Sequence, residues 1–410
     1  MVRPTGSADL PLHGGHVPPW LAQRMQRLGR TIAEAIVHHY GRDELLRRLA
    51  HPFWFQAFGA VMGMDWHSSG ITTSVVGALK RGLAPLEREL GVRVCGGRGR
   101  HSRRTPDELL AVGARTGIDA LALGRASRLV AKVDSAAVQD GFDLYLHAFV
   151  VTDDGRWTVV QQGMNPARRQ ARRYHWLSEG LASFVDAPHA AIDGPPQGEI
   201  LNLTDPRAAD ARRAEVALAT GDPAAVVGLL TQLRNDADRL PHLCMPAHHE
   251  VRPSDVLLRR LRGTLAAAAE CGPRDFADLL LVPGVGARTV AALALVSEVI
   301  HGAPSRFADP ARFAMAHGGK DGHPFPVPLT VYDETIRVLR AALDRARLGM
   351  DDRLAAVRRL DAQARRLEDW VRGPTVPEVI VEERARSAEY GGRTVSGPAP
   401  RRQLRLPGIE

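Results

Sequence analysis

The first part of the chain is a series of apolar helical patterns separated by short stops. Apolar residues recur at helical spacing from Leu21 to Tyr40, and Gly41 ends this run. A second helix is predicted to follow through about Leu49. The next segment, HPFWFQAFGAVMGMDW, is rich in large aromatic residues, which belong in a core. These patterns predict an N-terminal helical lobe over residues 1–95.

The centre of the chain shows the alternation of apolar and polar residues that is typical of strands. Three strands are predicted, at 129–134, 144–152 and 157–162. Asp153-Asp154-Gly155-Arg156 is expected to form the turn of a hairpin between the last two. Helices are predicted on either side, at about 106–116 and 166–186. The expected fold class is a mixed α/β (α+β) region with a small central sheet, antiparallel or mixed, over residues 96–187.

The remainder of the chain is predicted to be helical. A Pro/Gly-rich stretch at 188–205 is expected to be a linker. Amphipathic patterns then predict an all-α region over residues 206–345, including a helical hairpin. A charged helix at 346–381 and a basic disordered tail at 382–410 complete the expected organisation.

Charge is the first property that limits the class of binding partner. The net charge is +8, and this excess of positive charge favours a polyanionic partner. Only three of the basic residues are lysines, namely Lys80, Lys132 and Lys320. No apolar run approaches the roughly 18–20 residues that span a bilayer, and the N-terminus lacks the apolar core of a signal peptide. The three cysteines have no metal-ligand spacing. We therefore expect a cytoplasmic protein without a membrane partner.

The most informative stretch is DFADLLLVPGVGARTVAALALVSEVIHG, from Asp275 to Gly302. Two apolar helical patterns flank the turn Pro283-Gly284-Val285-Gly286. Its glycines permit a tight turn and expose N–H groups at the start of a helix, where the helix dipole favours a phosphate. Arg288 adds a charged donor. The pattern predicts nucleic-acid contacts from Gly284, Val285, Gly286, Arg288 and Thr289. A helix pair used only for packing is the alternative.

Two arginine-rich segments are further candidates for nucleic-acid contact. The first, CGGRGRHSRRTP, combines glycines that permit close backbone approach with charge, and it contains Gly97, Arg98 and Arg100. In the second, Arg168 and Arg172 fall at helical spacing beside the aromatic residues of YHW. A solvated loop and a solvated helix face are the respective alternatives.

Acidic residues near the predicted strand ends are candidates for catalysis. Within a strand, Lys132 and Asp134 would share one face, and Asp140 follows closely. Asp134 and Asp140 are predicted ligands of Mg²⁺ or Mn²⁺, with Lys132 stabilising charge during phosphodiester cleavage. Polar strand ends with a Lys–Asp pair are the alternative. Lys320 and Asp321, in the Gly-rich loop HGGKDG, form a second catalytic candidate.

Several segments together resemble an uncharacterised prokaryotic family, domain of unknown function 763. They extend from Thr5 to Val327 and leave mainly the C-terminal tail outside. The segments are TGSADLPLHGG, HPFWFQAFGAVMGMDWHSSGITT, GGRGRHSRRTP, KVDSAAVQDGF, QQGMN, MPAHHEV, VPGVG and AHGGKDGHPFPV. The resemblance implies a bacterial or archaeal cytosolic protein with a C-terminal hairpin module, and it brings no activity.

The 275–302 segment is also similar to the helix-hairpin-helix motif of DNA-repair proteins, including base-excision glycosylases. That resemblance implies sequence-independent contact with the DNA backbone. Lyase members carry a lysine two positions after the turn, where this chain has Arg288, and arginine cannot form a Schiff base at neutral pH. Asp309 lies near the expected spacing of a glycosylase aspartate, but without a V-D-T-H-like context.

The sequence therefore predicts a DNA-binding protein of DNA repair or processing. A metal-dependent nuclease, a non-catalytic nucleic-acid-binding protein and a glycosylase without the lyase lysine stay open as alternatives. DNA is the expected partner, and no residue in the sequence excludes RNA.

Overall fold

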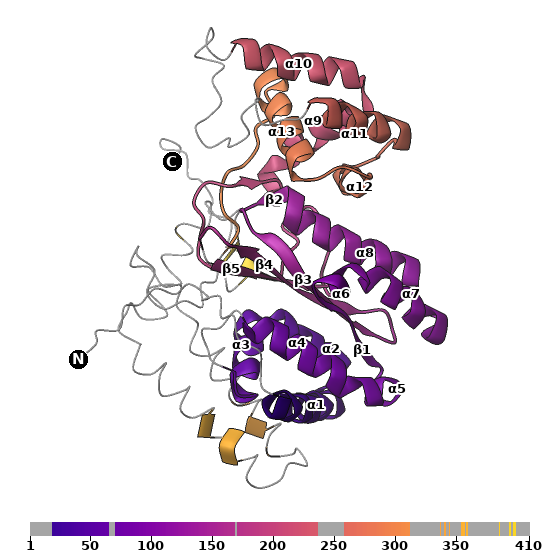
Figure 1. Cartoon of the computed structure of the whole chain (residues 1–410), viewed down its shortest axis with the longest axis vertical. Coiled ribbons are helices and arrows are strands. Elements are labelled where there is room, and N and C mark those ends of the chain that lie inside the picture. The colour runs from indigo at the N-terminus through magenta and orange to yellow at the C-terminus, as the bar shows by residue number, and fades with distance from the viewer. Residues whose placement is uncertain are drawn as a thin grey trace, which may run out of the picture.

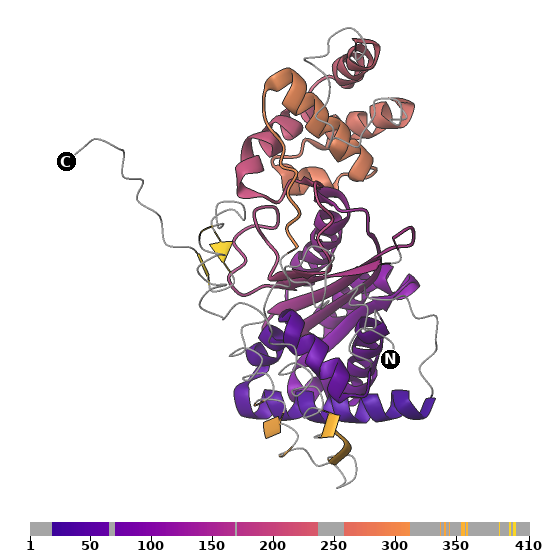
Figure 2. The same cartoon turned by 90° about the vertical axis from the view of Figure 1, so that its left-hand side faces the viewer.

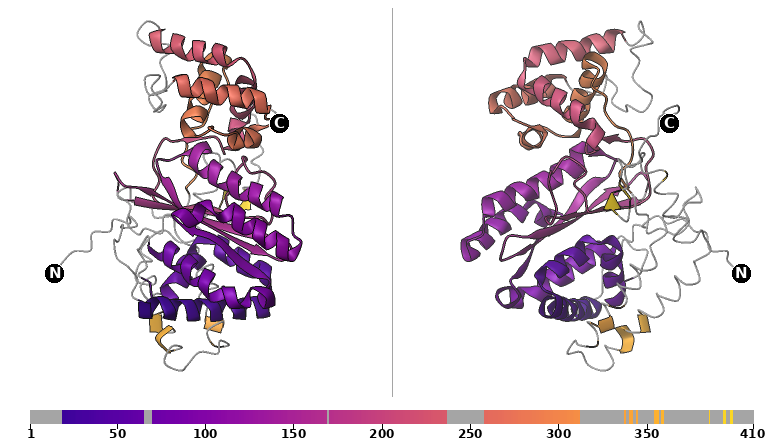
Figure 3. Two further views of the ribbon diagram at one scale, coloured as in Figure 1. Left: turned by 45° about the vertical axis from the view of Figure 1, so that its right-hand side comes forward. Right: turned by 180° about the vertical axis from the view of Figure 1, so that it is seen from behind.

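The computed structural model describes residues 19–64, 70–168, 170–236 and 258–311, together with isolated residues between 337 and 398. The fold is mixed α/β with a small antiparallel sheet. Figure 1 shows the sheet in the middle of the molecule, with helices on both faces and a further tier of helices, α9 to α13, at one end. The same order of layers is visible after rotation in Figures 2 and 3.

The N-terminal helices cover one face of the sheet. They are α1 (Pro19–Tyr40), α2 (Arg42–Ala50), α3 (Pro52–Val61), α4 (Gly70–Leu83), the 3-10 turn η1 (Ala84–Leu86) and α5 (Glu87–Leu90). Trp54, Phe55 and Phe58 of α3 are buried in one core with apolar side chains from the first strands of the sheet. The aromatic segment therefore joins these helices to the sheet.

The five-stranded sheet has the order β1-β3-β4-β5-β6, and every neighbouring pair is antiparallel. Its strands are β1 (Val92–Arg98), β3 (Asp143–Thr152), β4 (Trp157–Asn165), β5 (Gln170–Leu177) and β6 (Ala191–Asp193). The predicted hairpin is confirmed, because β3 and β4 pair with Val150 opposite Thr158. The predicted helix at 106–116 is also confirmed as α7 (Thr105–Thr116).

The predicted strand at 129–134 is wrong. This segment is the end of helix α8 (Ala120–Lys132) and the start of a π-helical turn, η2 (Val133–Ala137). Asp119 caps α8 by accepting a hydrogen bond of 2.9 Å from the N–H of Ala122. The buried residues of this stretch follow a helical spacing and include Leu123, Ala126, Val130 and Val133. A six-residue window was too short to separate the two periods.

The predicted helix at 166–186 is also wrong, because its first half is strand β5. Alternate residues of β5 point to opposite faces of the sheet. Tyr174 and Trp176 enter the core beneath α7 and α8, whereas the ring of His175 lies against Phe55 of α3. Arg172 and Arg173 therefore belong to an interior strand of the sheet, and Arg168 belongs to the turn before it, rather than to a helix surface.

The Pro/Gly-rich segment at 188–205 contributes two strands. β6 completes the edge of the main sheet, and β7 (Leu201–Asn202) pairs with β2 (Val138–Gln139), which follows η2. This second, two-stranded ladder lies beside the N-terminus of α13, where Gln139 contacts the main chain. The segment thus connects the sheet to the helical tier through ordered backbone.

The helical tier packs around α9. It consists of η3 (Pro206–Ala208), α9 (Ala209–Thr220), α10 (Pro223–Asp236), α11 (Leu258–Cys271), α12 (Phe276–Leu281) and α13 (Ala287–His301). α9 contacts α11, α12 and α13, and α12 also contacts α8. A single hydrophobic core runs from the sheet into this tier. The remaining described ladder joins β8 (Arg393–Thr394) to β9 (Gly397–Pro398).

Among the described helices, none alone has the length and apolar composition needed to cross a membrane. A bent pair, 206–220 with 223–232, meets that criterion jointly.

Candidate nucleic-acid interface

The segment that the sequence singled out forms a helical hairpin of α12, a five-residue turn and α13. Asp275 begins α12 by accepting a hydrogen bond of 2.7 Å from the N–H of Asp278. Gly284 has a φ of +87°, a conformation that residues with a Cβ rarely adopt. A Cβ added at Gly284 would also lie 3.0 Å from Oγ1 of Thr264 on α11. The turn therefore needs glycine at 284 both for its backbone shape and for its contact with α11.

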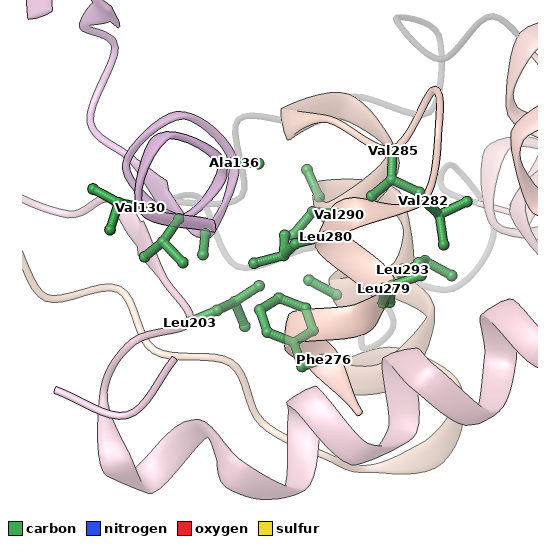
Figure 4. Packing of buried hydrophobic residues seen from close by; sticks show 14 of the residues in the cluster. Val130, Ala136, Leu203, Phe276, Leu279, Leu280, Val282, Val285, Val290 and Leu293 are labelled. Carbon is green, nitrogen blue, oxygen red and sulfur yellow. The ribbon is translucent and has the colours of Figure 1, made fainter. Parts of the chain in front are cut away.

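One side of the hairpin is buried against the rest of the molecule. Figure 4 shows Leu280 and Val290 on the side of the hairpin toward Val130 and Ala136, which come from α8 and η2. Val285 belongs to the same buried cluster. Phe276, Leu279 and Leu280 of α12 join the same core and are 0–3% exposed. Burial of this kind contributes roughly 1.5–3 kcal/mol for each large side chain. The hairpin is therefore held on a fixed support.

Two polar side chains of that support hold the turn by its carbonyl groups. Lys132 Nζ donates a hydrogen bond to the carbonyl of Val285. Gln139 Nε2 donates to the carbonyl of Ala287 at 2.8 Å and to that of Ala136 at 3.0 Å. Partial burial lowers the pKa of the Lys132 ammonium group. Lys132, predicted to be catalytic, therefore positions the turn of the hairpin in this structure.

The N-terminus of α13 is open on the other side of the turn. Gly286 occupies the N-cap position in an extended conformation and supplies no side-chain cap. The first hydrogen bond within the helix runs from the N–H of Val290 to the carbonyl of Gly286 at 3.0 Å. The N–H groups of Ala287, Arg288 and Thr289 precede that bond, as at every helix start. They carry the positive end of a 15-residue helix dipole.

A groove of about 430 Å³ separates α11 from the hairpin turn. Arg260 and Arg288 are both exposed at this groove, one on each of its helices. Thr264 and Thr289 supply hydroxyl groups to the same lining, and none of its described residues carries a carboxylate. The described residues of the lining are Arg260, Leu261, Gly263, Thr264, Pro283, Gly284, Arg288 and Thr289. Such a lining suits an anion that accepts hydrogen bonds.

Some of the hairpin residues that were predicted to contact nucleic acid line the groove, and others do not. Gly284, Arg288 and Thr289 line the groove, whereas Val285 is buried beneath the turn. The sequence did not single out Arg260 and Thr264 as site residues. Arg260 lies in the run LRRLRG, whose exposed arginines all precede the hairpin. Only the packing of α11 against the turn decides that Arg260 lines the groove.

The basic segment around Gly97 is ordered by internal contacts. Lys80 Nζ reaches Oε2 of Glu108 at 2.6 Å and the carbonyl of Gly96 at 2.8 Å. This anchor holds the end of β1 on α7. Gly97 has a φ of +136° there, and Arg98 lies 5.9 Å from the ring centre of Tyr145. Arg98 and Arg100, in β1 and α6 (Arg100–Arg103), are exposed and stay available to a polyanion.

The second arginine-rich segment divides into one exposed and one buried residue. Arg168 is exposed and donates to the side chain of Gln197. Arg172 is 0% exposed, with Nη1 2.9 Å from Asp140 and Nη2 2.6 Å from Asp309. Burial opposes its charge, but Asp309 and Asp140 outweigh that effect and raise the pKa of Arg172. The predicted contact between Arg172 and nucleic acid is therefore inconsistent with its position in the core.

The two predicted metal ligands lie in separate hydrogen-bond networks. Asp134 is fully buried, with Trp176 Nε1 at 3.0 Å and His189 Nε2 at 2.5 Å, and it also accepts from Gln161. Asp140 accepts from Arg172 and from the hydroxyl of Tyr174 at 2.7 Å. Burial raises the pKa of Asp140, against the lowering effect of Arg172.

Contrary to the prediction from the sequence, Asp134 and Asp140 therefore do not act together as ligands of one Mg²⁺ or Mn²⁺ ion. In the described part of the chain, one group brings three His, Cys, Asp or Glu ligand atoms within 4.8 Å of one another, and it consists of Glu34, His38 and Glu89. The second pair of catalytic candidates, Lys320 and Asp321, lies outside the described residues.

Asp309, the aspartate that the glycosylase comparison selected, is bound to other groups of the protein core. Besides Arg172, its carboxylate accepts hydrogen bonds from the N–H groups of Gln197 at 2.6 Å and Ala311 at 2.8 Å. Its side chain is 5% exposed. Asp309 therefore forms part of the buried ion pair with Arg172, and it does not line the groove.

These features define a protein in which an antiparallel sheet with helices on both faces supports a helical hairpin and a cationic groove. The chain belongs to the family described as protein of unknown function (DUF763), whose model matches residues 6–327. No curated protein and no solved structure matches the chain.

Proposed function

We propose that this protein binds the phosphate backbone of DNA through the groove between α11 and the hairpin turn. One observation carries the proposal. Two exposed guanidinium groups, from Arg260 and Arg288, line the same groove as the open N-terminus of α13, and no described residue adds a carboxylate there. Arginine pairs with phosphate through two parallel hydrogen bonds, and the helix start adds backbone donors. The net charge of +8 favours the same partner.

The support beneath the hairpin favours binding over a purely structural role. The apolar side of the hairpin already packs on α8, α9 and η2. Pro283, Gly284 and Arg288, on the groove side, are exposed. A helix pair that served only for packing would need no cationic groove on its solvent side. The lining can contact phosphates without reading bases, so binding would be largely independent of sequence.

A wider basic surface would extend the contact. Arg98 and Arg100 are exposed near the end of β1, and Arg259 and Arg262 are exposed on α11. We place the protein in DNA repair or processing because of the similarity of its hairpin to that of repair proteins. The proposal is one of binding, since Asp134 and Asp140 are held in internal networks.

The decisive experiment is a salt titration of binding to labelled single-stranded DNA, duplex DNA and RNA, followed by fluorescence anisotropy. Wild-type protein should bind at low salt and lose affinity as salt rises. Arg288→Ala should lower affinity and reduce the slope of log K against log salt by about 1. Arg260→Ala should behave in the same way. RNA binding as tight as DNA binding would widen the partner to both.

Arg115→Ala is the matched control. Arg115 is exposed on α7, outside the groove, so the variant loses the same charge while keeping the groove intact. Its salt slope should equal that of the wild type. Equal slopes for Arg288→Ala and wild type, or no binding at low salt, would refute the proposal.

A further inference from the structure

We propose that a cavity on the sheet side of the hairpin turn accepts one unstacked nucleobase, with an exocyclic amino group, from the bound strand. The cavity has a volume of about 370 Å³, within the roughly 300–1,000 Å³ that is typical of small-molecule pockets. Asp143 and Arg168 are exposed at the cavity, so it communicates with solvent. This inference rests on the proposed function, because the groove must first hold the strand.

The position of the cavity relative to the groove is the first argument. Ala287 lines the cavity, whereas Arg288, the next residue, lines the groove. Consecutive Cα atoms are about 3.8 Å apart. The first turn of α13 is therefore the wall between the two spaces. A strand with a phosphate at this helix start would bring an adjoining nucleoside to the edge of the cavity.

The chemistry of the lining is the second argument. Phe142, Ile200, Leu201 and Phe307 supply apolar surface, and Asn165 is among the polar groups of the same cavity. A nucleobase combines the same two kinds of surface, because it has two apolar faces and a hydrogen-bonding edge. Proteins that take a base out of the stack hold it by contacts of both kinds. A phosphate or a sugar alone would leave the apolar part of the lining without a partner.

The hydrogen-bonding groups of the lining select the edge of the base. Gln139 uses its Nε2 on the carbonyls of Ala136 and Ala287, so its Oε1 is the atom left to accept. The carboxylates of Asp143 and Glu199 are further acceptors at the cavity, and the guanidinium group of Arg168 is a donor. Asn165 accepts from the N–H of Arg168 at 3.0 Å through Oδ1, so its Nδ2 remains to donate. A lining with acceptors from Gln139, Asp143 and Glu199, and with donors from Asn165 and Arg168, suits an amino group adjacent to a ring nitrogen.

This arrangement favours adenine, cytosine or guanine over thymine and uracil. The edge of thymine or uracil places carbonyl oxygens on both sides of its ring N–H, and a lining with more acceptor than donor side chains suits such an edge less well. The expected preference is about 10-fold or more, because an unpaired polar group in a binding site weakens binding.

The test uses single-stranded DNA with one 2-aminopurine, a fluorescent base that carries an exocyclic amino group. Full-length protein is added until the anisotropy of a distant label shows saturation. Emission from the 2-aminopurine should rise, because stacking in the free strand quenches it. Ser135→Phe, which fills the cavity from an exposed position of η2, should abolish the rise at protein concentrations that still saturate the DNA. Asp143→Asn should reduce it.

Ala114→Phe provides the control, since it adds the same ring to an exposed site on α7 outside the cavity. Its anisotropy and emission should match those of the wild type. Saturable binding without a rise in emission would overturn the cavity assignment and leave the proposed function standing. An equal rise in Ser135→Phe would also overturn it. Absence of binding at low salt would refute the proposed function itself, and the cavity assignment with it.

Discussion

Lys132, the last residue of α8, donates a hydrogen bond from Nζ to the main-chain carbonyl of Val285 in the hairpin turn. The two residues are 153 positions apart in the chain. The bond fastens the turn to the sheet-bearing part of the molecule, and Gln139 fastens the next part of the same backbone. The groove that we assign to phosphate therefore depends on a lysine that does not line it.

Replacement of this lysine tests that dependence. Lys132→Met keeps the length of the side chain but leaves the Val285 carbonyl without its donor. We expect a loss of about 1–3 kcal/mol in the free energy of unfolding, together with weaker DNA binding. Urea unfolding and the anisotropy titration measure the two effects. Arg128→Met, an exposed charge loss on the same helix, should change stability by less than about 0.5 kcal/mol. Equal behaviour of the two variants would contradict the positioning role.

The two glycines of the turn should respond differently to alanine. Gly284→Ala places a Cβ at a φ of +87° and 3.0 Å from Thr264 Oγ1. We expect it to lower the free energy of unfolding by about 1 kcal/mol or more. Gly286→Ala is the matched comparison, since Gly286 has a φ of −153° and a Cβ there meets nothing within 4 Å. Urea midpoints should fall for the first variant only, and a larger fall for Gly286→Ala would argue against the described turn.

Removal of the buried guanidinium group of Arg172 should damage the fold. Arg172→Met leaves Asp140 and Asp309 without their shared cation in the core. The breaking of a buried pair commonly costs about 3–5 kcal/mol. Arg168→Met, at the exposed end of the same segment, should stay within about 0.5 kcal/mol of wild type. Circular dichroism and urea unfolding distinguish the two. A stable Arg172→Met protein with weakened DNA binding would restore the surface role that the sequence predicted.

Glu215 should make stability depend on pH. Its two carboxylate oxygens are fully buried on α9 and have no hydrogen-bond partner among the described residues. Burial raises the pKa of Glu215 well above the usual value, and Arg212 opposes this effect. The folded state therefore holds the proton more tightly than the unfolded state. The stabilisation is complete below the unfolded pKa of about 4.3 and is lost as pH rises through the folded value.

Glu215→Gln removes this titration while keeping the shape of the side chain. The melting temperature of the variant minus that of the wild type should be smallest near pH 4 and should grow as the pH is raised toward 8. Thermal melts at several pH values measure the difference. A difference that stays constant over this range would show that Glu215 does not titrate between the folded and unfolded states.

The helical hairpin was predictable because its determinants are local. The apolar spacing on both sides of Pro283, and the glycines that follow it, fix two helices and a tight turn within a single stretch of chain. The β-hairpin of β3 and β4 was predictable for the same reason, since alternation and the turn around Gly155 lie side by side. In both cases the pattern extends over enough residues to define its period.

Other assignments failed where the deciding partner is remote. The arginines near 172 looked like a basic helix surface, because the sequence does not reveal that Asp140 and Asp309 neutralise Arg172 inside the sheet. The short run ending at Asp134 has the composition of a strand, but it forms the end of α8 and the start of η2. There Asp134 contacts Gln161, Trp176 and His189, which are remote in the sequence. Burial of charge depends on such distant partners.

The sequence by itself thus determined a basic α/β protein with a helical hairpin around a turn that contains Gly284 and Gly286. Tertiary structure alone decided which charges reach solvent, which carboxylates are committed to the core, and that Arg260 of α11 joins Arg288 in one groove. The physical reason is that periodicity and turn chemistry act over a few neighbouring residues. Charge neutralisation and groove formation instead depend on side chains brought together from segments far apart in the chain.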